Sequence, residues 1–218
     1  MRAANRFARR PLFNWTIVTP TGAPATLTCG LDVASAGTLS SLGPVDMLLV
    51  ISGFNQSIHA TAPILRHLQR LAPRLAALGG VEAGPWVLAR AGLLNGHRAT
   101  THWEDLEDFA TAHPEIEVIA DRFVISGNRM TAGGAAPAMD MMLDLIRSRY
   151  GQPLALQVAG VFIYESARGG SDRQPIMSRA RVERRDPLVA RALDLMEAYV
   201  EDPLPIARLC QQLGVSRR

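Results

Sequence analysis

Apolar and polar residues along the chain alternate in blocks that predict short strands separated by amphipathic helices. The block Val45–Ile51 is apolar at every position except Asp46 and has the length of a strand covered on both faces. Between Thr61 and Ala72, leucine and isoleucine recur at helical spacing, with a proline in the first turn and another just past the end. Alternation of this kind is typical of a layered α/β domain.

The same pattern extends over most of the chain. We predict further strands at Trp15–Thr19, Ala25–Cys29, Arg74–Val81, His97–Thr101, Glu117–Ile119, Arg122–Ile125 and Arg129–Thr131, and further helices over Met1–Arg10, Trp103–Ala112, Met139–Tyr150 and Leu154–Tyr164. Thr101 and Glu104 have the spacing of a capping box that would start one of these helices. The predicted fold class is α/β, a three-layer sandwich around a mostly parallel sheet.

The most distinctive stretch is Leu78–Ala89, which the pattern predicts to be a buried strand, a sharp turn and the first turns of a helix. Its three glycines relieve the crowding that such a turn creates, and Pro85 suits a first helical turn. In α/β enzymes this geometry lifts one side chain above the sheet as a nucleophile. The lifted residue here is Glu82, a carboxylate where nucleophilic catalysis needs cysteine or serine.

From residue 186 onward the pattern predicts helices alone. One apolar face runs from Leu188 to Tyr199, a Pro-Leu-Pro sequence turns the chain, and a second, shorter face runs from Ile206 to Leu213. A helix stop, an apolar anchor and the N-cap Ser216 follow, which is the order of elements in a helix–turn–helix. We therefore predict Ser216, Arg217 and Arg218 as DNA contacts at the start of a recognition helix, and we expect the rest of that helix to be missing from the 218 residues.

Composition narrows the class of protein. The chain is 48% hydrophobic and 20% charged, as is ordinary for a folded protein, and no apolar run reaches the length of a membrane span. No signal peptide is recognisable, so we expect a cytoplasmic protein without membrane contact. Cys29 and Cys210 are far apart and no Cys/His spacing suits zinc, so we expect no disulfide, no metal site and no cofactor.

The segment from Ser166 to Asp186 is basic. Its six arginines outnumber three acidic residues, and it contains two adjacent glycines and Pro175. Such a segment suits a linker that lies beside a polyanion, although a merely solvated linker would have the same composition. All 23 basic residues of the chain are arginine, and we give this bias no functional weight.

Three pieces of the sequence carry a resemblance to a known family. They are GGVEAGPWVLARAGLLNGHRATTHWED, NRMTAGGAAPAMDMMLDLI and DPLVARALDLMEAYVEDPLPIARLCQQLGVSRR. Together they resemble the AraC-type transcriptional regulators that carry a ThiJ/PfpI-like, class I glutamine amidotransferase-like N-terminal domain, the GlxA group. The resemblance covers nearly the whole chain and implies a flavodoxin-like fold.

The resemblance also implies a division of the chain. Residues 1–165 correspond to a ligand-sensing domain without its first strand, residues 166–185 to a basic linker, and residues 186–218 to the start of a DNA-binding domain without its recognition helix. Members of this group begin with a further strand and end with a second helix–turn–helix. We therefore expect this chain to be a fragment, truncated at both ends, of a longer regulator.

The resemblance matches two elbow positions to a hydrolase site. In the amidotransferase-like hydrolases a cysteine occupies the position of Glu82, and a histidine reaches it from the position of His102. A thiolate beside a base is the reactive species in that chemistry. Because the thiol is lost, and Cys29 lies in the wrong segment to replace it, we expect no catalytic residue and no enzyme activity. A hydrolase or amidase that uses Glu82 and His102 for acid–base chemistry is the alternative.

A receptor site is the preferred interpretation of the elbow. A half-buried carboxylate needs a cation or hydrogen-bond donors, and indole faces beside it suit an ammonium or guanidinium group. The resemblance implies regulators of choline, betaine, carnitine or arginine catabolism. We predict that a small cationic metabolite binds Glu82 between Trp86, His102 and Trp103, with a backbone N–H from Gly53. Core packing of both indoles, and a purely structural role for Glu82, are the alternatives.

The expected partners are promoter DNA for the full-length protein and a small-molecule effector. We also expect a homodimer, because activators of this kind need paired half-sites. A pure dimerisation module is a third possible function. The sequence does not indicate which face would pair.

Overall fold

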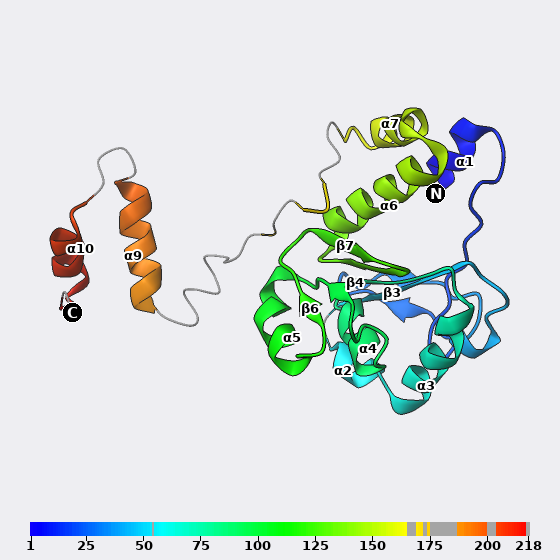
Figure 1. Ribbon diagram of the computed structural model, residues 1–218, viewed down its shortest axis with the longest axis horizontal. Coiled ribbons are helices and arrows are strands. Elements are labelled where there is room, and N and C mark those ends of the chain that lie inside the picture. The colour runs from blue at the N-terminus through cyan, green and yellow to red at the C-terminus, as the bar shows by residue number, and fades with distance from the viewer. Residues whose placement is uncertain (54, 165–168, 172–173, 175–186, 200–203, 217–218) are drawn as a thin grey trace. The chain divides into compact units, whose positions relative to one another are not determined.

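The computed structural model describes residues 1–53, 55–164, 169–171, 174, 187–199 and 204–216 (Figure 1). The chain forms two compact units, Met1–Gln174 and Pro175–Arg218. The first unit contains the sheet and the elbow, and the second contains two helices. We describe each unit by itself.

A four-stranded sheet forms the centre of the first unit. Its strands, in spatial order, are β3 (Met47–Ser52), β4 (Ala77–Glu82), β8 (Arg129–Ala132) and β7 (Phe123–Ser126). The first three are parallel, and only β7 runs antiparallel to its neighbour β8, through a tight turn at Gly127. The predicted mostly parallel sheet is confirmed. Ser52 and Glu82 are paired at the carboxyl ends of β3 and β4, so both strands finish at the same edge.

Helices cover both faces of this sheet, which gives the predicted three layers (Figure 1). On one face lie α2 (Gln56–His59), α3 (Ala62–Leu71), α4 (Gly84–Arg90) and α5 (Leu106–Ala112), and on the other lie α1 (Arg2–Ala8), α6 (Ala135–Tyr150) and α7 (Gln152–Val161). Successive residues of β4 point to opposite faces: Leu78 packs with Leu68, Leu88 and Phe109, whereas Ala77 packs with residues of α6 such as Met141. The core therefore consists of apolar clusters on either side of one strand.

Two short pairs of strands lie beside the main sheet. β1 (Ala25–Thr26) and β2 (Asp32–Val33) form an antiparallel pair, and β5 (Arg98–Ala99) and β6 (Glu117–Val118) form a parallel one.

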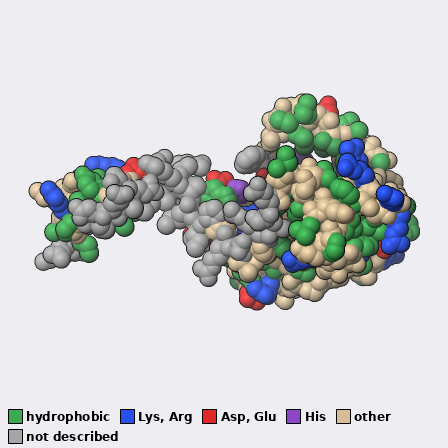
Figure 2. Space-filling model, turned by 90° about the horizontal axis from the view of Figure 1, so that it is seen from above, with side chains coloured by type: hydrophobic (Ala, Val, Ile, Leu, Met, Phe, Trp, Pro, Cys, Tyr) green, Lys and Arg blue, Asp and Glu red, His purple; other side chains and the backbone are tan. Residues whose placement is uncertain are grey.

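Apolar side chains remain exposed on α7 and just past its end, at Leu156, Phe162 and Ile163. Figure 2, which views the first unit from the side of α1, α6 and α7, shows hydrophobic side chains scattered over this surface.

The predicted strand Trp15–Thr19 is wrong. Within the described part of the chain, this segment contributes only an isolated bridge between Thr19 and Thr38, and Trp15 and Ile17 are each 50% exposed. Its β-branched residues favour extended backbone, but only its end, at Ile17 and Thr19, forms backbone hydrogen bonds with a neighbouring segment, residues 36–39, which is too short a pairing for a strand.

The predicted capping box of Thr101 and Glu104 is also wrong. The N-cap is His102, whose Nδ1 accepts a hydrogen bond of 3.4 Å from the Glu104 N–H. The first turn is a 3-10 helix, Trp103–Asp105, and α5 begins only at Leu106. Thr101 instead lies one residue before the N-cap, and its hydroxyl donates to the carbonyl of Glu82.

The second unit contains α9 (Pro187–Ala198) and α10 (Ile206–Leu213), which contact each other. α10 ends as predicted at Gly214, which adopts φ 70°, and the Val215 N–H donates to the Cys210 carbonyl at 3.0 Å. Ser216 is exposed. Arg217 and Arg218, like all six arginines of the predicted basic linker, lie outside the described residues.

Among the helices that the structure describes, none is long and apolar enough to cross a membrane. Both cysteines are free: Cys29 is exposed and Cys210 is half-buried. The described residues also contain no group of three or more His, Cys, Asp or Glu side chains that would hold a metal ion.

Candidate functional site

The predicted strand–turn–helix is present at the end of β4. Glu82 is the last residue of the strand and adopts φ 60°, a left-handed conformation that costs a non-glycine residue about 1–2 kcal/mol. The Ala83 N–H donates to the Ser52 carbonyl at 2.9 Å, and α4 starts at the next residue. The turn therefore lifts the Glu82 side chain above the carboxyl edge of the sheet.

Two glycines allow the helix to approach the sheet this closely. A Cβ added at Gly84 would lie 2.0 Å from the carbonyl oxygen of Val50 in β3. A Cβ at Gly80 would lie 2.6 Å from the backbone nitrogen of Pro85. Both clashes are with backbone, so no side-chain rotation would relieve them. The shape of the elbow thus depends on residues that flank Glu82.

The carboxylate of Glu82 lies against the end of β3. The side chain is half-buried, and a Cβ built on Gly53 would be 3.5 Å from its Oε1 atom. Gly53 and Glu82 are therefore neighbours, and the predicted hydrogen bond from the Gly53 N–H to a ligand stays a prediction. Among the described residues no charged group forms an ion pair with this carboxylate, and its Oε1 atom lies beside the backbone at the end of β3.

The backbone of Glu82 is held from the segment after β5. Its carbonyl oxygen accepts hydrogen bonds from the Thr101 hydroxyl at 2.8 Å and from the His102 N–H at 3.3 Å. Thr101 is completely buried. These two bonds bring the predicted site residue His102 next to Glu82 along the backbone.

The imidazole of His102 is about one-third exposed and lies among polar and aromatic neighbours. Its Nδ1 is 3.8 Å from Oε2 of Glu104, and its ring centroid is 5.4 Å from that of Trp103, with the planes tilted by 45°. A Cβ on Gly134, just before α6, would lie 3.9 Å from the imidazole Cδ2. His102 and Trp103 therefore form a partly exposed aromatic pair near the elbow.

Trp86 makes its observed aromatic contacts with α5 and the residue that follows it. Its ring meets Phe109 at a centroid distance of 5.0 Å and His113 at 5.7 Å, both in edge-to-face geometry. Phe109 is fully buried, and Trp86 packs against the same apolar cluster. These contacts favour core packing for Trp86, and its role as a wall of the ligand site stays a prediction.

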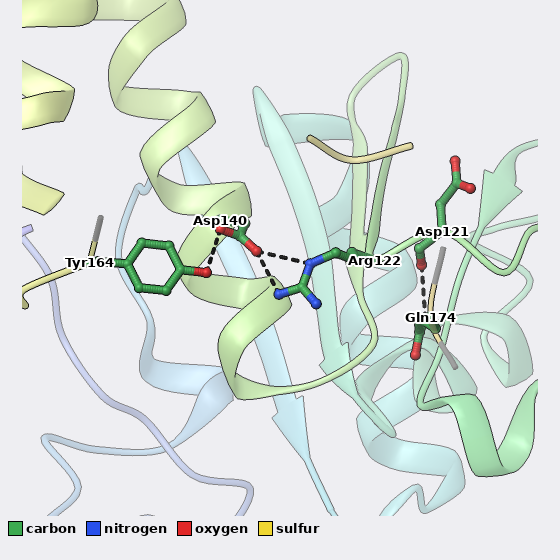
Figure 3. Close-up of polar contacts among 5 residues, drawn as sticks. All are labelled: Asp121, Arg122, Asp140, Tyr164 and Gln174. Atoms are coloured by element: carbon green, nitrogen blue, oxygen red, sulfur yellow. Dashed lines mark hydrogen bonds and ion pairs between the residues drawn. The ribbon is translucent and has the colours of Figure 1, made fainter. Parts of the chain in front are cut away.

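The sequence analysis missed a buried polar network beside the elbow. Gln174 is 5% exposed, and its Nε2 lies 2.8 Å from Oγ1 of Thr100, 2.9 Å from the carbonyl of Thr101 and 2.8 Å from the carbonyl of Asp121. Figure 3 shows the Gln174 amide directed at Asp121. We expected the linker to begin at residue 166, yet Gln174 belongs to the first compact unit. A single glutamine among arginines gives no local signal of burial.

A second polar cluster also involves the chain just beyond α7. The side chain of Asp140 is fully buried and accepts hydrogen bonds from Arg122, at 2.7 and 3.1 Å, and from the Tyr164 hydroxyl at 2.8 Å (Figure 3). Burial, together with the adjacent Asp140 carboxylate, raises the pKa of Tyr164. The negative charge of Asp140 is paired with the guanidinium of Arg122, so we interpret this cluster as structural.

The elbow thus offers a carboxylate, a neighbouring imidazole and an indole at the carboxyl edge of a parallel sheet. That edge is where α/β folds bind their ligands. The position from which a nucleophile would attack carries Glu82, which has neither a thiol nor a hydroxyl. The chemistry available to it is cation binding, hydrogen bonding or proton transfer.

Comparison with known proteins identifies relatives of the whole chain. A profile of the DJ-1/PfpI family matches residues 3–148. The HTH-type transcriptional regulator CdhR of Pseudomonas aeruginosa is 34% identical over 218 residues, which cover 100% of this chain and 65% of that protein. The chain therefore spans about two thirds of the length of this curated relative.

Two further matches bear on the fold and the chemistry. The crystal structure of an AraC family transcriptional regulator from Pseudomonas putida superposes with a TM-score of 0.66 at 28% identity, covering 74% of this chain and 86% of that one. Isonitrile hydratase of Pseudomonas putida is 32% identical over 136 residues, 59% of this chain and 56% of that protein. Proteins named as regulators and one named as an enzyme are thus among the relatives of this chain.

Proposed function

The chain belongs to the DJ-1/PfpI family, and from this premise we propose that it is part of a transcriptional regulator controlled by a small molecule. In this proposal the first unit binds the effector and the second begins a DNA-binding domain of the AraC type. The complete protein binds promoter DNA, pairs as a homodimer and controls catabolic genes. The proposal is supported by the regulator CdhR, which aligns with all 218 residues of this chain.

The observation that carries the proposal is the carboxylate at the elbow. A left-handed turn holds Glu82 at the place where a nucleophile would stand, at the ligand-binding edge of the sheet. A carboxylate there forms no thioester or acyl-thiol, but it binds a cation well when water is partly excluded. Loss of the nucleophile with retention of the turn suits a receptor.

We propose a small cationic metabolite as the effector, of the choline, betaine, carnitine or arginine type. Glu82 supplies the negative charge, Gly53 a backbone N–H, and the pair His102 and Trp103 an aromatic surface. Trp86 completes the wall only if its ring leaves the contact with Phe109. The weight of the proposal therefore rests on Glu82 and on the pair from the segment after β5.

Isothermal titration of the 218-residue chain tests this site. We expect choline, glycine betaine, carnitine or arginine to bind, and Glu82→Gln to weaken binding by about tenfold or more, because a charge-assisted contact is worth about 1.5–3 kcal/mol. Glu117→Gln, which removes an exposed carboxylate on β6, is the control and should leave affinity unchanged. Binding that is indifferent to Glu82→Gln would refute the cationic site.

The DNA arm of the proposal is tested on the complete regulator. Its shift of promoter DNA should weaken steeply as salt rises, because arginine–phosphate contacts release counterions. The 218-residue chain, which holds Ser216, Arg217 and Arg218 but no further recognition residues, should bind weakly and without sequence preference. A complete protein that shifts no promoter fragment at low salt would overturn this part.

An enzyme is the second candidate, favoured by the match to isonitrile hydratase and by the proximity of His102 to Glu82. In that case Glu82 and His102 would perform acid–base chemistry on a bound substrate. We expect no turnover of amide, isonitrile or glyoxalase-type substrates. Turnover that disappears in His102→Ala would show that the protein is a hydrolase or hydratase and would refute the receptor hypothesis.

A further inference from the structure

We propose that Gln174 is a positioning residue of the elbow, and that its buried amide couples the Glu82 site to the chain that leads toward α9. The inference rests on the proposed effector site and adds how occupancy of that site would be transmitted. Gln174 is the last described residue of the first unit. The chain that continues from it enters the second unit.

The coupling runs through two hydrogen bonds that share one residue. Gln174 Nε2 donates to the Thr101 carbonyl at 2.9 Å, and the Thr101 hydroxyl donates to the Glu82 carbonyl at 2.8 Å. The next residue, His102, also donates its N–H to that same carbonyl. A displacement of the left-handed turn at Glu82 therefore acts directly on Thr101, and through Thr101 on Gln174.

The slot that holds Gln174 is shaped for its amide. A Cβ on Gly133 would lie only 2.3–2.6 Å from the amide atoms, so the side chain fills the space that this glycine leaves. The Gln174 N–H also donates to the Ala120 carbonyl at 2.7 Å. Since the amide is buried and lies among three oxygen atoms, its position is fixed by polar contacts as well as by packing.

The slot and the ligand site share a wall. Gly133 borders the Gln174 amide, and its neighbour Gly134 borders the imidazole of His102. The two side chains thus flank one turn that precedes α6. A cation that draws Glu82 or His102 into a new position changes the surroundings of Gln174 from both sides.

The described contacts beyond α7 attach the chain to the first unit as far as Gln174. Tyr164 is bonded to Asp140 at one end, Gly170 accepts from the Arg122 N–H, and Gln174 closes the other end. Release of Gly170 and Gln174 would add ten residues to the connection, roughly 35 Å of extended chain. Such a change alters the reach and the effective concentration of a tethered DNA-binding unit.

Two substitutions remove the anchor by different routes. Gln174→Ala deletes the amide, whereas Gly133→Ala keeps it but places a methyl group in its slot, where the flexible end of Gln174 must move. Hydrogen exchange, followed by mass spectrometry on the 218-residue chain, reports on the bonded amide of His102. We expect both variants to speed exchange at residues 100–102 by about fivefold or more. Gly160→Ala is the control: its added methyl group would have no atom within 4 Å, so the exchange rate at residues 100–102 should not change.

The pattern of exchange separates positioning from general stability. Peptides from the middle of α6, around the buried Leu143 and Ile146, should exchange alike in wild type and in both variants. Faster exchange in all peptides would assign Gln174 a general stabilising role and overturn the proposal. Unchanged exchange at residues 100–102 would also overturn it.

A second arm uses glycine betaine at saturation as the probe. Bound betaine should change tryptic cleavage at Arg179, Arg181, Arg184 and Arg185 in the wild type, and this change should be lost in Gln174→Ala. If betaine binds but alters cleavage equally in both proteins, the coupling is refuted. If betaine does not bind, that choice of effector fails while the exchange experiment without ligand still decides the role of Gln174.

Discussion

The hydroxyl of Thr101 donates a hydrogen bond of 2.8 Å to the carbonyl oxygen of Glu82. This bond joins the tip of the elbow to the segment that follows β5, and it lies in a region where Thr101 has no exposed surface. The strained residue of the elbow is therefore held by a neighbour that comes from 19 residues further along the chain.

Thr101→Val should destabilise the first unit by about 1–2 kcal/mol. Valine keeps the shape of threonine, but the Glu82 carbonyl would keep only the longer bond from the His102 N–H. Urea denaturation measures the loss. Thr111→Val is the matched control, since the Thr111 hydroxyl is exposed and bonds within its own helix, and should change stability by less than about 0.5 kcal/mol. Equal losses in the two variants would contradict the role of Thr101.

Gly84→Ala should cost more than about 2 kcal/mol. The added methyl group would lie 2.0 Å from the Val50 carbonyl, so β3 and α4 must separate to admit it. Gly160→Ala provides the contrast, because its Cβ meets nothing within 4 Å and the residue lies inside α7. There alanine should stabilise the protein by about 0.5–1 kcal/mol. Thermal and urea unfolding of the two variants should therefore shift in opposite directions.

Asp140→Asn should destabilise the first unit by about 3–5 kcal/mol, because it leaves the largely buried guanidinium of Arg122 without its counter-charge. Asp144→Asn, on the same helix, removes a carboxylate whose partner Arg147 is largely exposed. That change should cost less than about 1 kcal/mol. A small loss at Asp140, measured by the same urea titration, would show that the buried pair contributes little.

The stability of the first unit should fall more steeply above pH 10 than that of Tyr164→Phe. Burial and Asp140 raise the pKa of Tyr164 above its ordinary value of 10, so the folded protein keeps the phenolic proton after the unfolded chain has lost it. The contribution is complete below pH 10 and disappears as the pH rises through the raised pKa. Unfolding free energies measured between pH 8 and pH 11 test this, and parallel curves for the two proteins would contradict it.

Local patterns predicted the elbow and most of the sheet. The glycines and Pro85 around Glu82 specify a turn by themselves, because each acts on the backbone within a few residues. The stretch Val45–Ile51 likewise contains enough apolar surface to predict the strand β3, but the expectation that both its faces are covered is wrong, because β3 lies at the edge of the described sheet and none of its residues is fully buried. The resemblance to AraC-type regulators with a ThiJ/PfpI-like domain, which rests on these motifs, is confirmed by the matches to CdhR and to the DJ-1/PfpI family.

Contacts between distant segments were beyond the reach of local patterns. Trp15–Thr19 has the composition of a strand, yet pairing depends on a neighbour elsewhere in the chain. Thr101 has the spacing of an N-cap, but His102 occupies that position, and the Thr101 hydroxyl donates to a carbonyl 19 residues away. Gln174 is buried only because Gly133 and three oxygen atoms meet around it, and nothing in its own neighbourhood of sequence indicates such an environment.

The close approach at Gly80 and Gly84 has a consequence for how this fold diversifies. The backbone clashes that would break the turn arise at these two positions, whereas the Glu82 carboxylate lies near Gly53 at the end of β3. A single codon change at position 82 can therefore exchange one functional group for another without remodelling the scaffold. A catalyst and a receptor built on this turn can therefore differ by one amino-acid substitution.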